Sequence, residues 1–302
     1  MLNFFLLILI YTCIYALMAI GQNVITGYTG MLSMCQAGFF AIGSYATAIL
    51  CTKFGWSFWA TLPVSIGVSA LFGFLIGLPT LRLKGDYLAI ATLGFGEIVR
   101  NVLNNWDSLT NGPMGIQGIP MATIFGKKIN PYTKVGFLIL CVVFVLIAYF
   151  LFQRLARSRM GRALEAIRED EIAAASTGIN ITKYKVVAFM LGAGVAGVAG
   201  SLQAVFNLSV TPGTYTFMVS VIVLCMIVLG GMGNFFAAIF GSFIIQLISY
   251  FPQLTGLSSV FPPQFKQILF GLILVVMMIW RPQGILGRKE HLYGQDRKGG
   301  AR

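Results

Sequence analysis

The amino-acid sequence predicts an all-α polytopic membrane protein. Of its 302 residues, 57% are hydrophobic and 10% are charged, and the mean hydropathy is +0.84. A water-soluble domain carries about a quarter charged residues because its surface faces water. The apolar residues also form long runs, and a membrane-spanning helix needs about 18 or more such residues. A transmembrane β-barrel would show shorter segments of alternating hydrophobicity instead.

Hydropathy along the chain predicts nine spans, within a range of about eight to ten helices. The fourth, seventh and ninth are short for a hydrocarbon layer of about 30 Å, so we expect some helices to be broken. We expect residues 1–287 to form a single transmembrane domain and residues 288–302 to form a polar cytoplasmic tail. The predicted spans are residues 2–20, 31–52, 56–78, 88–103, 134–152, 185–206, 217–229, 235–251 and 267–280.

The first predicted span has an alternative interpretation, because an apolar N-terminus can be a cleaved signal peptide. A signal peptide has a positive segment before its apolar region and a small-residue cleavage site. The first basic residue of this chain is Lys53. We therefore expect residues 2–20 to remain as a span of the mature protein.

The basic residues predict the orientation. Most of the 21 Lys and Arg residues fall in three segments, residues 82–84, 154–185 and 281–302. Alternate threading of the spans places all three on one side, which the positive-inside rule makes cytoplasmic. We expect a multi-pass protein of a bacterial inner membrane, surrounded by lipid, with its C-terminus in the cytoplasm. Topology accounts for the net charge of +12, and no compact basic face remains, so we expect no nucleic-acid partner.

Side chains for catalysis or metal binding are sparse. The single histidine, His291, lies in the polar tail, and the five cysteines lie in or beside apolar segments without metal-ligand spacing. The chain has no G-x-x-x-x-G-K-[ST] phosphate loop. We expect no catalytic residue, no metal site and no cofactor bound by this chain. If ATP drives the protein, another chain hydrolyses it.

Polar side chains and glycines interrupt the apolar sequence between the first two spans. Irregular backbone at membrane depth is tolerated only where it is buried in protein or lines a cavity. Lining of a substrate pathway and a plain cytoplasmic turn are both open interpretations. The pathway candidates are Gln22, Asn23, Thr26, Gly27, Thr29, Gly30, Ser33 and Gln36, together with Glu97 in a later span.

Glu97 lies inside a predicted span, three residues before Arg100 and on the same helical face. A charge inside a membrane is costly and therefore a functional candidate. An ion pair within the helix, near its outer end, explains Glu97 as well.

Glycine accounts for 35 of the 302 residues, and several glycines have helix-packing spacing. Gly73 and Gly77 form one pair, and Gly194, Gly197 and Gly200 recur in one span. Small residues at this spacing let helix backbones approach closely, either within this chain or against a partner subunit. Residues 39–45 also echo residues 235–243, each after a glycine-rich stretch. Internal repeats and ordinary packing seams are both open explanations of that echo.

Residues 160–179 predict one amphipathic helix in a cytoplasmic loop. Leu164, Ile167 and Ile172 give it an apolar side, Gly178 is a C-terminal stop, and four of the nine acidic residues cluster there. Helices that lie on a membrane favour basic polar faces. The acidic face therefore favours docking onto a protein over lying on lipid.

Taken together, these segments resemble the LivM-type permeases of branched-chain amino acid ABC importers. The loop at residues 165–178 resembles the segment by which such permeases insert into their ATPase subunits. The other matching motifs are residues 27–30 (GYTG), 36–45 (QAGFFAIGSY), 83–95 (LKGDYLAIATLGF), 110–116 (TNGPMGI), 229–234 (LGGMGN) and 281–287 (RPQGILG).

The resemblance implies a heterodimer with a homologous permease subunit, two ABC ATPase subunits that bind ATP and Mg, and an extracytoplasmic substrate-binding protein. That binding protein would deliver leucine, isoleucine or valine and would face residues 110–132. The residues expected to couple to the ATPases are Arg162, Glu165, Ala166, Arg168, Glu169, Asp170, Glu171, Ala174 and Gly178. Two alternatives remain open: a related importer for urea or short amides, and a stand-alone secondary transporter that would use Glu97.

Overall fold

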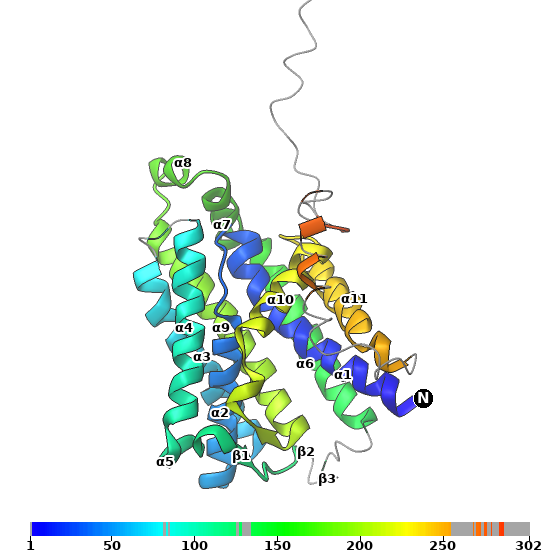
Figure 1. Ribbon diagram of the computed structural model, residues 1–302. Helices are drawn as coiled ribbons and strands as arrows, with labels where there is room; N and C mark the ends of the chain where they lie inside the picture. The colour runs from blue at the N-terminus through cyan, green and yellow to red at the C-terminus, as the bar shows by residue number, and fades with distance from the viewer. Residues whose placement is uncertain are drawn as a thin grey trace, which may run out of the picture.

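The computed structural model describes residues 2–80, 83, 85–124, 127–128, 134–254, 268, 270–272, 275–276, 279 and 284–286. Long helices lie side by side in one bundle (Figure 1). In the described residues, five segments are long and apolar enough to cross a membrane: Asn3–Tyr28, Phe58–Pro79, Val135–Ala156, Ile181–Asn207 and Pro212–Gly230. The predicted all-α polytopic fold class is confirmed.

The long helices follow the predicted spans closely. They are α1 (Leu2–Gln22), α2 (Gln36–Lys53), α3 (Phe58–Thr80), α4 (Asp86–Asn105), α6 (Val135–Ala156), α9 (Ile181–Asn207), α10 (Phe217–Gly230) and α11 (Phe235–Leu254). Eight predicted spans coincide with these helices to within a few residues at most ends. The ninth, residues 267–280, lies largely outside the described residues, as does the predicted tail at residues 288–302.

Shorter elements connect the long helices. They are the π-helix η1 (Asn23–Tyr28), the 3₁₀ helices η2 (Gly112–Met114) and η3 (Pro212–Thr214), and the helices α5 (Asp107–Thr110), α7 (Arg159–Glu169) and α8 (Glu171–Ser176). Strand β1 (Ile116–Gln117) pairs antiparallel with β4 (Ser209–Val210), and β2 (Thr123–Ile124) with β3 (Lys127–Lys128).

The second span begins later than predicted. Residues 31–35 were expected to be helical, but α2 starts at Gln36. Side chains from other helices satisfy the intervening backbone: the Met34 N–H donates to the Thr92 hydroxyl at 2.9 Å, and the Ser33 carbonyl accepts from the Gln22 amide at 2.6 Å. Because a buried backbone group needs a partner, these contacts replace the helical hydrogen bonds.

The interrupted stretch before this segment is not a plain turn. The first helix continues from Gln22 into η1 without a break and ends at Tyr28. Gly30 has a positive φ of 72°, at the point where the chain changes direction. The two segments that echo each other, residues 39–45 and 235–243, lie in the first turns of α2 and α11. An internal repeat remains a prediction.

The centre of the bundle is the contact among α2, α3 and α9. A Cβ added to Gly43 would lie 2.4 Å from the Cα of Gly197, so the two helices touch backbone to backbone. The Ser65 hydroxyl donates to the carbonyls of both glycines, at 3.2 and 3.1 Å. Gly73 and Gly200 also meet backbone atoms of neighbouring helices. These glycines therefore let helices of this chain pack against one another, which is one of the two explanations that their spacing allows.

The loops that were predicted to share one side do meet at one end of the bundle. Leu83 and Gly85, from the turn after α3, line the same pocket as Arg168 of α7. The Ile285 N–H donates to the Leu229 carbonyl at 2.9 Å, at the end of α10. The N-terminus and β1 lie toward the opposite end from α7 and α8 (Figure 1).

Candidate functional site

Helices α7 and α8 form an end segment that lies across the tips of the spans. Helix α7 starts at the N-cap Ser158, whose hydroxyl accepts from the Met160 N–H at 3.2 Å. Leu164 and Ile167 are buried against the bundle. These two side chains therefore hold α7 in place, as apolar residues on one face of an amphipathic helix do.

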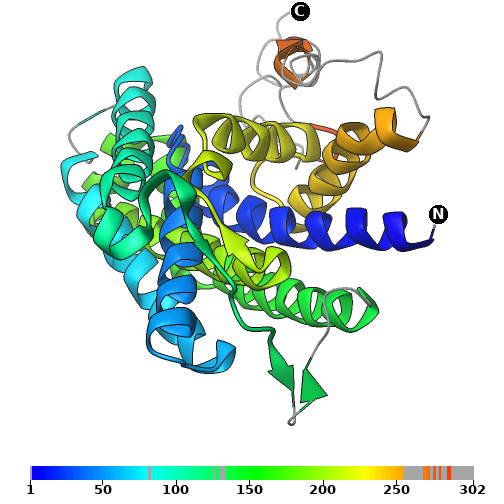
Figure 2. The ribbon, with the colours of Figure 1, turned by 60° about the horizontal axis from the view of Figure 1, so that its bottom comes forward.

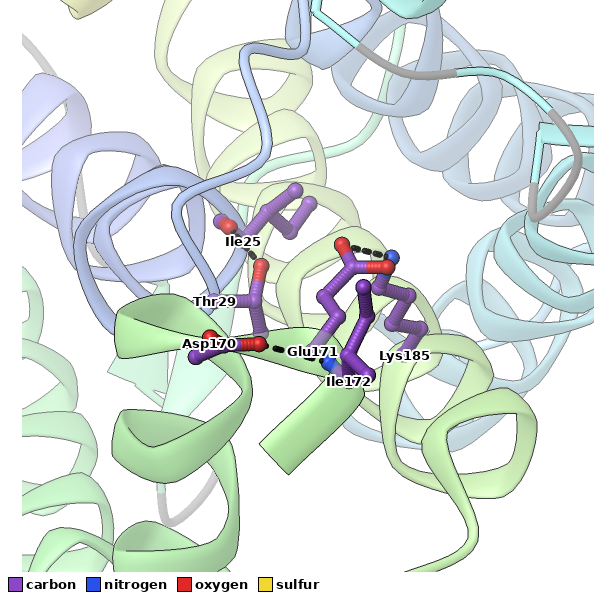
Figure 3. Close-up of polar contacts among 6 residues, drawn as sticks. All are labelled: Ile25, Thr29, Asp170, Glu171, Ile172 and Lys185. Carbon is purple, nitrogen blue, oxygen red and sulfur yellow. Dashed lines mark hydrogen bonds and ion pairs between the residues drawn. The ribbon is translucent and has the colours of Figure 1, made fainter. Parts of the chain in front are cut away.

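The prediction of one helix over residues 160–179 is wrong, because the helix breaks at Asp170. This residue is extended, with φ −155° and ψ 112°. Its carboxylate accepts from the N–H of Ile172 at 2.8 Å (Figure 3). It also accepts from the N–H of Ala173 at 3.0 Å. The same two hydrogen bonds lower the pKa of Asp170 from its ordinary value. An N-cap in mid-sequence thus ends one helix and starts the next.

Gly178 ends α8 as predicted. Its φ is +86°, its N–H donates to the Ala175 carbonyl at 2.9 Å, and the Ile179 N–H donates to the Ala174 carbonyl at 3.2 Å. This pair of bonds is the Schellman arrangement, which favours glycine because a side chain is strained at positive φ.

The break changes which residues face outward. Ile172 was expected on the same apolar side as Leu164 and Ile167, and that expectation is wrong: its side chain is 75% exposed. Ile172 is the second residue of α8, and that helix does not continue the face of α7.

Arg168 joins α7 to the end of the first span. Its Nη1 donates to the Gly27 carbonyl at 2.8 Å, and its aliphatic part lies against Gly30. The Gly27 carbonyl belongs to the last turn of η1, where the helix dipole favours a cation. A Cβ on Gly27 would lie 2.7 Å from the Gly233 nitrogen, and Asn23 accepts from the same N–H at 3.0 Å. Helix α7, η1 and the α10–α11 turn therefore meet at one point.

Lys185 joins α8 to α9. Its ammonium lies 2.5 Å from the Glu171 carboxylate, and its side chain is 4% exposed (Figure 3). A buried ammonium requires an anionic partner. From the sequence, Lys185 is predicted only as one of the basic residues of the cytoplasmic loop, because a pairing over 14 residues follows no local spacing rule.

A pocket of about 390 Å³ lies between the end segment and the bundle. Its lining comes from the residues that follow η1, the start of α4, the α7–α8 junction and the start of α9. It includes Thr29, Met31, Leu32, Leu88, Glu169, Ile172 and Lys185. The end segment is thus attached by a few polar contacts and by the buried side chains of Ala163, Leu164, Ile167 and Ala174, with open space beside them.

The expected coupling residues differ in exposure. Exposed ones are Arg162, Arg168, Glu169, Asp170 and Gly178; partly buried ones are Glu165, Ala166 and Glu171; Ala174 is buried. Ala174 therefore faces the bundle rather than a partner.

The pathway candidates from Gln22 to Gln36 gather around η1, and all of them except the exposed Gly30 are buried. The Gln22 amide donates to the Thr26 hydroxyl at 2.9 Å, and the Gln36 amide donates to the Met18 carbonyl at 3.1 Å. Thr29 donates to the Ile25 carbonyl, and Ser33 lies 3.1 Å from the Cys35 sulfur (Figure 3 shows Thr29 and Ile25). In the described residues, the second amide atoms of Gln22, Asn23 and Gln36 have no partner.

Glu97 does not join that cluster. It lies in α4 and forms an ion pair with Arg100 at 2.7 Å, and the two side chains are 31% and 35% exposed. The structure shows the intrahelical pair that the sequence offered as one explanation.

Comparison with known proteins identifies the family of this chain. The profile of the family described as "Branched-chain amino acid transport system / permease component" matches residues 4–278. The chain belongs to this family. As a member, it is a permease subunit rather than an enzyme.

Several curated relatives match most of the chain. The high-affinity branched-chain amino acid transport system permease proteins LivM of Salmonella typhimurium and of Escherichia coli K12 are 41% and 40% identical, over 91% of this chain and 68% of each relative. The LivH permease protein of the same Escherichia coli strain is 28% identical, over 91% of this chain and 92% of LivH. No solved structure matches this chain significantly.

Proposed function

We propose that this chain is one of two membrane-spanning subunits of an ATP-driven importer for leucine, isoleucine and valine. The observation that carries the proposal is the end segment α7–α8, with its exposed Ile172 and acidic residues and its direct contact to the first span through Arg168. The relatives named as branched-chain amino acid permeases support the substrate class.

In this proposal, partner ATPase subunits contact α8 and the exposed side of α7. ATP and Mg bind to those partners, and this chain binds no cofactor. A displacement of the end segment reaches η1 through the Arg168–Gly27 hydrogen bond and α9 through the Glu171–Lys185 pair. Both contacts are short and charged, and such hydrogen bonds are stronger than neutral ones.

The element that responds is η1 with the extended segment after it. A π-helix departs from regular helical hydrogen bonding and is frequent at functional sites. The buried amides of Gln22, Asn23 and Gln36 retain atoms without a partner in the described structure. A shift of η1 would bring these groups to a substrate path, so the residues around η1 are the proposed lining.

The remaining parts of the assembly follow from this arrangement. The end with α7 and α8 faces the cytoplasm of a bacterial cell, together with the C-terminus. The opposite end, which carries α5, β1 and β2, faces an extracytoplasmic binding protein that delivers the substrate (Figure 1). The positive-inside rule supports this assignment of the cytoplasmic and extracytoplasmic ends.

The test is uptake of labelled leucine into proteoliposomes that contain this chain, its co-expressed permease, the ATPases and the binding protein. Uptake that requires ATP and is blocked by valine is the expected result. Competition by urea would indicate an importer of urea or short amides with the same ATP-driven mechanism. Uptake that follows an ion gradient without ATP, and that Glu97→Gln abolishes, would instead establish a secondary transporter.

A second experiment tests the coupling segment. Deletion of residues 165–178 should release the ATPases while the chain stays in the membrane. ATPase retention after that deletion would contradict the assigned docking segment.

A further inference from the structure

Helix α4 presents a different outer face from the other spans. Its most exposed large side chains are apolar (Tyr87, Ile90, Ile98 and Val102), and beside them the small or polar residues Ala91, Gly94, Glu97 and Asn101 recur every three or four residues along one side. Helix α6 instead exposes only apolar side chains in its middle, among them Ile139, Val143, Leu146, Ile147 and Phe150. The two helices lie on different sides of the bundle (Figures 1 and 2).

The ion pair of α4 lies deep within the helix. Glu97 is eleven residues from Asp86 and eight from Asn105, so at 1.5 Å per residue it is about 16 Å and 12 Å from the two ends. The 20 residues of α4 give it a length of about 30 Å, close to the thickness of the hydrocarbon layer, so the ion pair lies within the helix and not at its outer end as the sequence suggested. An ionised side chain facing lipid there costs about 3 kcal/mol on insertion scales. Protein rather than lipid is therefore expected over this face.

The glycine on this face is not used within the chain. A Cβ on Gly94 would meet nothing within 4 Å, whereas a Cβ on Gly43 or Gly197 would strike another helix. Small residues and amides such as Asn101 are what helix–helix contacts in membranes use. The partly exposed ion pair and the open space at Gly94 lie on the same surface of α4.

We propose that this face of α4, from Ala91 to Val102, is the contact surface for the homologous permease subunit. The inference rests on the proposed function and adds to it the surface where the two permeases meet. Escherichia coli K12 has two related permease proteins of one transport system, LivM and LivH, and both resemble this chain along most of its length. A related subunit of similar fold can place the corresponding helix against α4, as paired homologous subunits commonly do.

This placement also gives Glu97 a role different from that of the η1 cluster. The Glu97–Arg100 pair lies at the boundary between two subunits, where partner groups can satisfy its exposed oxygens and N–H groups. The outer end of α4 continues directly into α5 and η2. The subunit contact and the predicted binding-protein surface are therefore continuous.

The experiment is photo-cross-linking in the assembled transporter. A benzophenone amino acid is placed at Ile98, whose side chain is 62% exposed, and in a control chain at Leu146 of α6, which is 48% exposed. Irradiation in membranes with the co-expressed permease is followed by mass spectrometry of the adducts. The expected result is an adduct with the homologous permease from position 98 and no such adduct from position 146.

Two results would overturn the proposal. One is an adduct with the homologous permease from position 146 and none from 98. The other is an adduct from 98 that contains only lipid or a second copy of this chain.

A second pair of variants separates this surface from the proposed function. Ile98→Trp should abolish co-purification of the homologous permease, while Leu146→Trp should preserve it. One outcome is that the unmodified chain co-purifies with the homologous permease and supports uptake while both Trp variants also co-purify with that permease. This result would refute α4 as the contact surface and leave the proposed function intact. If the unmodified chain captures no second permease and shows no ATP-dependent uptake, the proposed function itself fails.

Discussion

The glycine contact at the centre of the bundle and the end segment α7–α8 are held in opposite ways. In the centre, Gly43 and Gly197 bring two backbones together, and Ser65 bonds both of their carbonyls. At the end, Arg168 and Lys185 make charged contacts beside a pocket of about 390 Å³. The central contact depends on shape over its whole area, whereas the end segment depends on single side chains. We infer that the centre maintains the fold and that the end segment transmits movement.

The largest expected effect comes from breaking the central contact. Gly43→Ala places a Cβ 2.4 Å from the backbone of Gly197, and overpacking costs about 1–3 kcal/mol or more. We expect a clear fall in the melting temperature of the purified protein, measured by fluorescence in detergent. Gly67→Ala is the matched control, because its Cβ meets nothing within 4 Å. Equal melting temperatures for the two variants would show that the α2–α9 approach does not limit stability.

The next effect is on transport rather than on stability. Arg168→Ala removes the donor to the Gly27 carbonyl. A hydrogen bond from a charged donor contributes about 1.5–3 kcal/mol, so we expect uptake to fall by about tenfold or more. ATPase binding, measured by co-purification, should remain. Arg159→Ala, an exposed arginine of the same helix, is the control and should transport normally. Normal uptake by Arg168→Ala would show that this residue does not transmit movement from the end segment to η1.

A smaller effect is expected at the Glu171–Lys185 pair. Glu171→Gln leaves a buried ammonium without its carboxylate, and we expect a loss of about 1 kcal/mol because Glu171 is partly exposed. Faster proteolysis between α8 and α9 would report the loosening. Glu169→Gln alters an exposed neighbour of the same charge and should leave that rate unchanged. An unchanged rate in Glu171→Gln would mean that α8 is held by other contacts.

The smallest effect is a pH dependence of α8. Because hydrogen bonds lower the pKa of Asp170 in the folded state, its cap contributes fully above the pKa of the unfolded chain. That contribution is lost as the pH falls through the lowered value. We expect the Ile172 and Ala173 amides to exchange hydrogen faster at acid pH, after correction for intrinsic exchange. Asp170→Asn caps a helix without titrating, so this extra acid dependence should disappear. Persistence of the dependence in that variant would assign it to another group.

Most of the architecture could be predicted because it depends on local composition. The spans were located from apolar runs, and the shared side of three basic segments from charge counts. The predicted start of α2 is five residues too early. Within residues 31–35, the backbone bonds to Gln22 of α1 and to Thr92 of α4, and no local pattern predicts such contacts between helices. Within the candidate site, Gly178 was identified correctly because a helix stop is a local signal.

The sequence alone determined that the chain is an all-α membrane protein, which family it belongs to and which loop carries the candidate coupling residues. The tertiary structure alone decided that Asp170 divides this loop into two helices, that Ile172 faces outward and that Arg168 reaches Gly27. It also separated Glu97 from the η1 cluster. Hydropathy, charge and capping act over a few residues, so they can be read along the chain. A contact between residues 27 and 168 depends on how four or more helices pack, and no pattern along the chain encodes that distance.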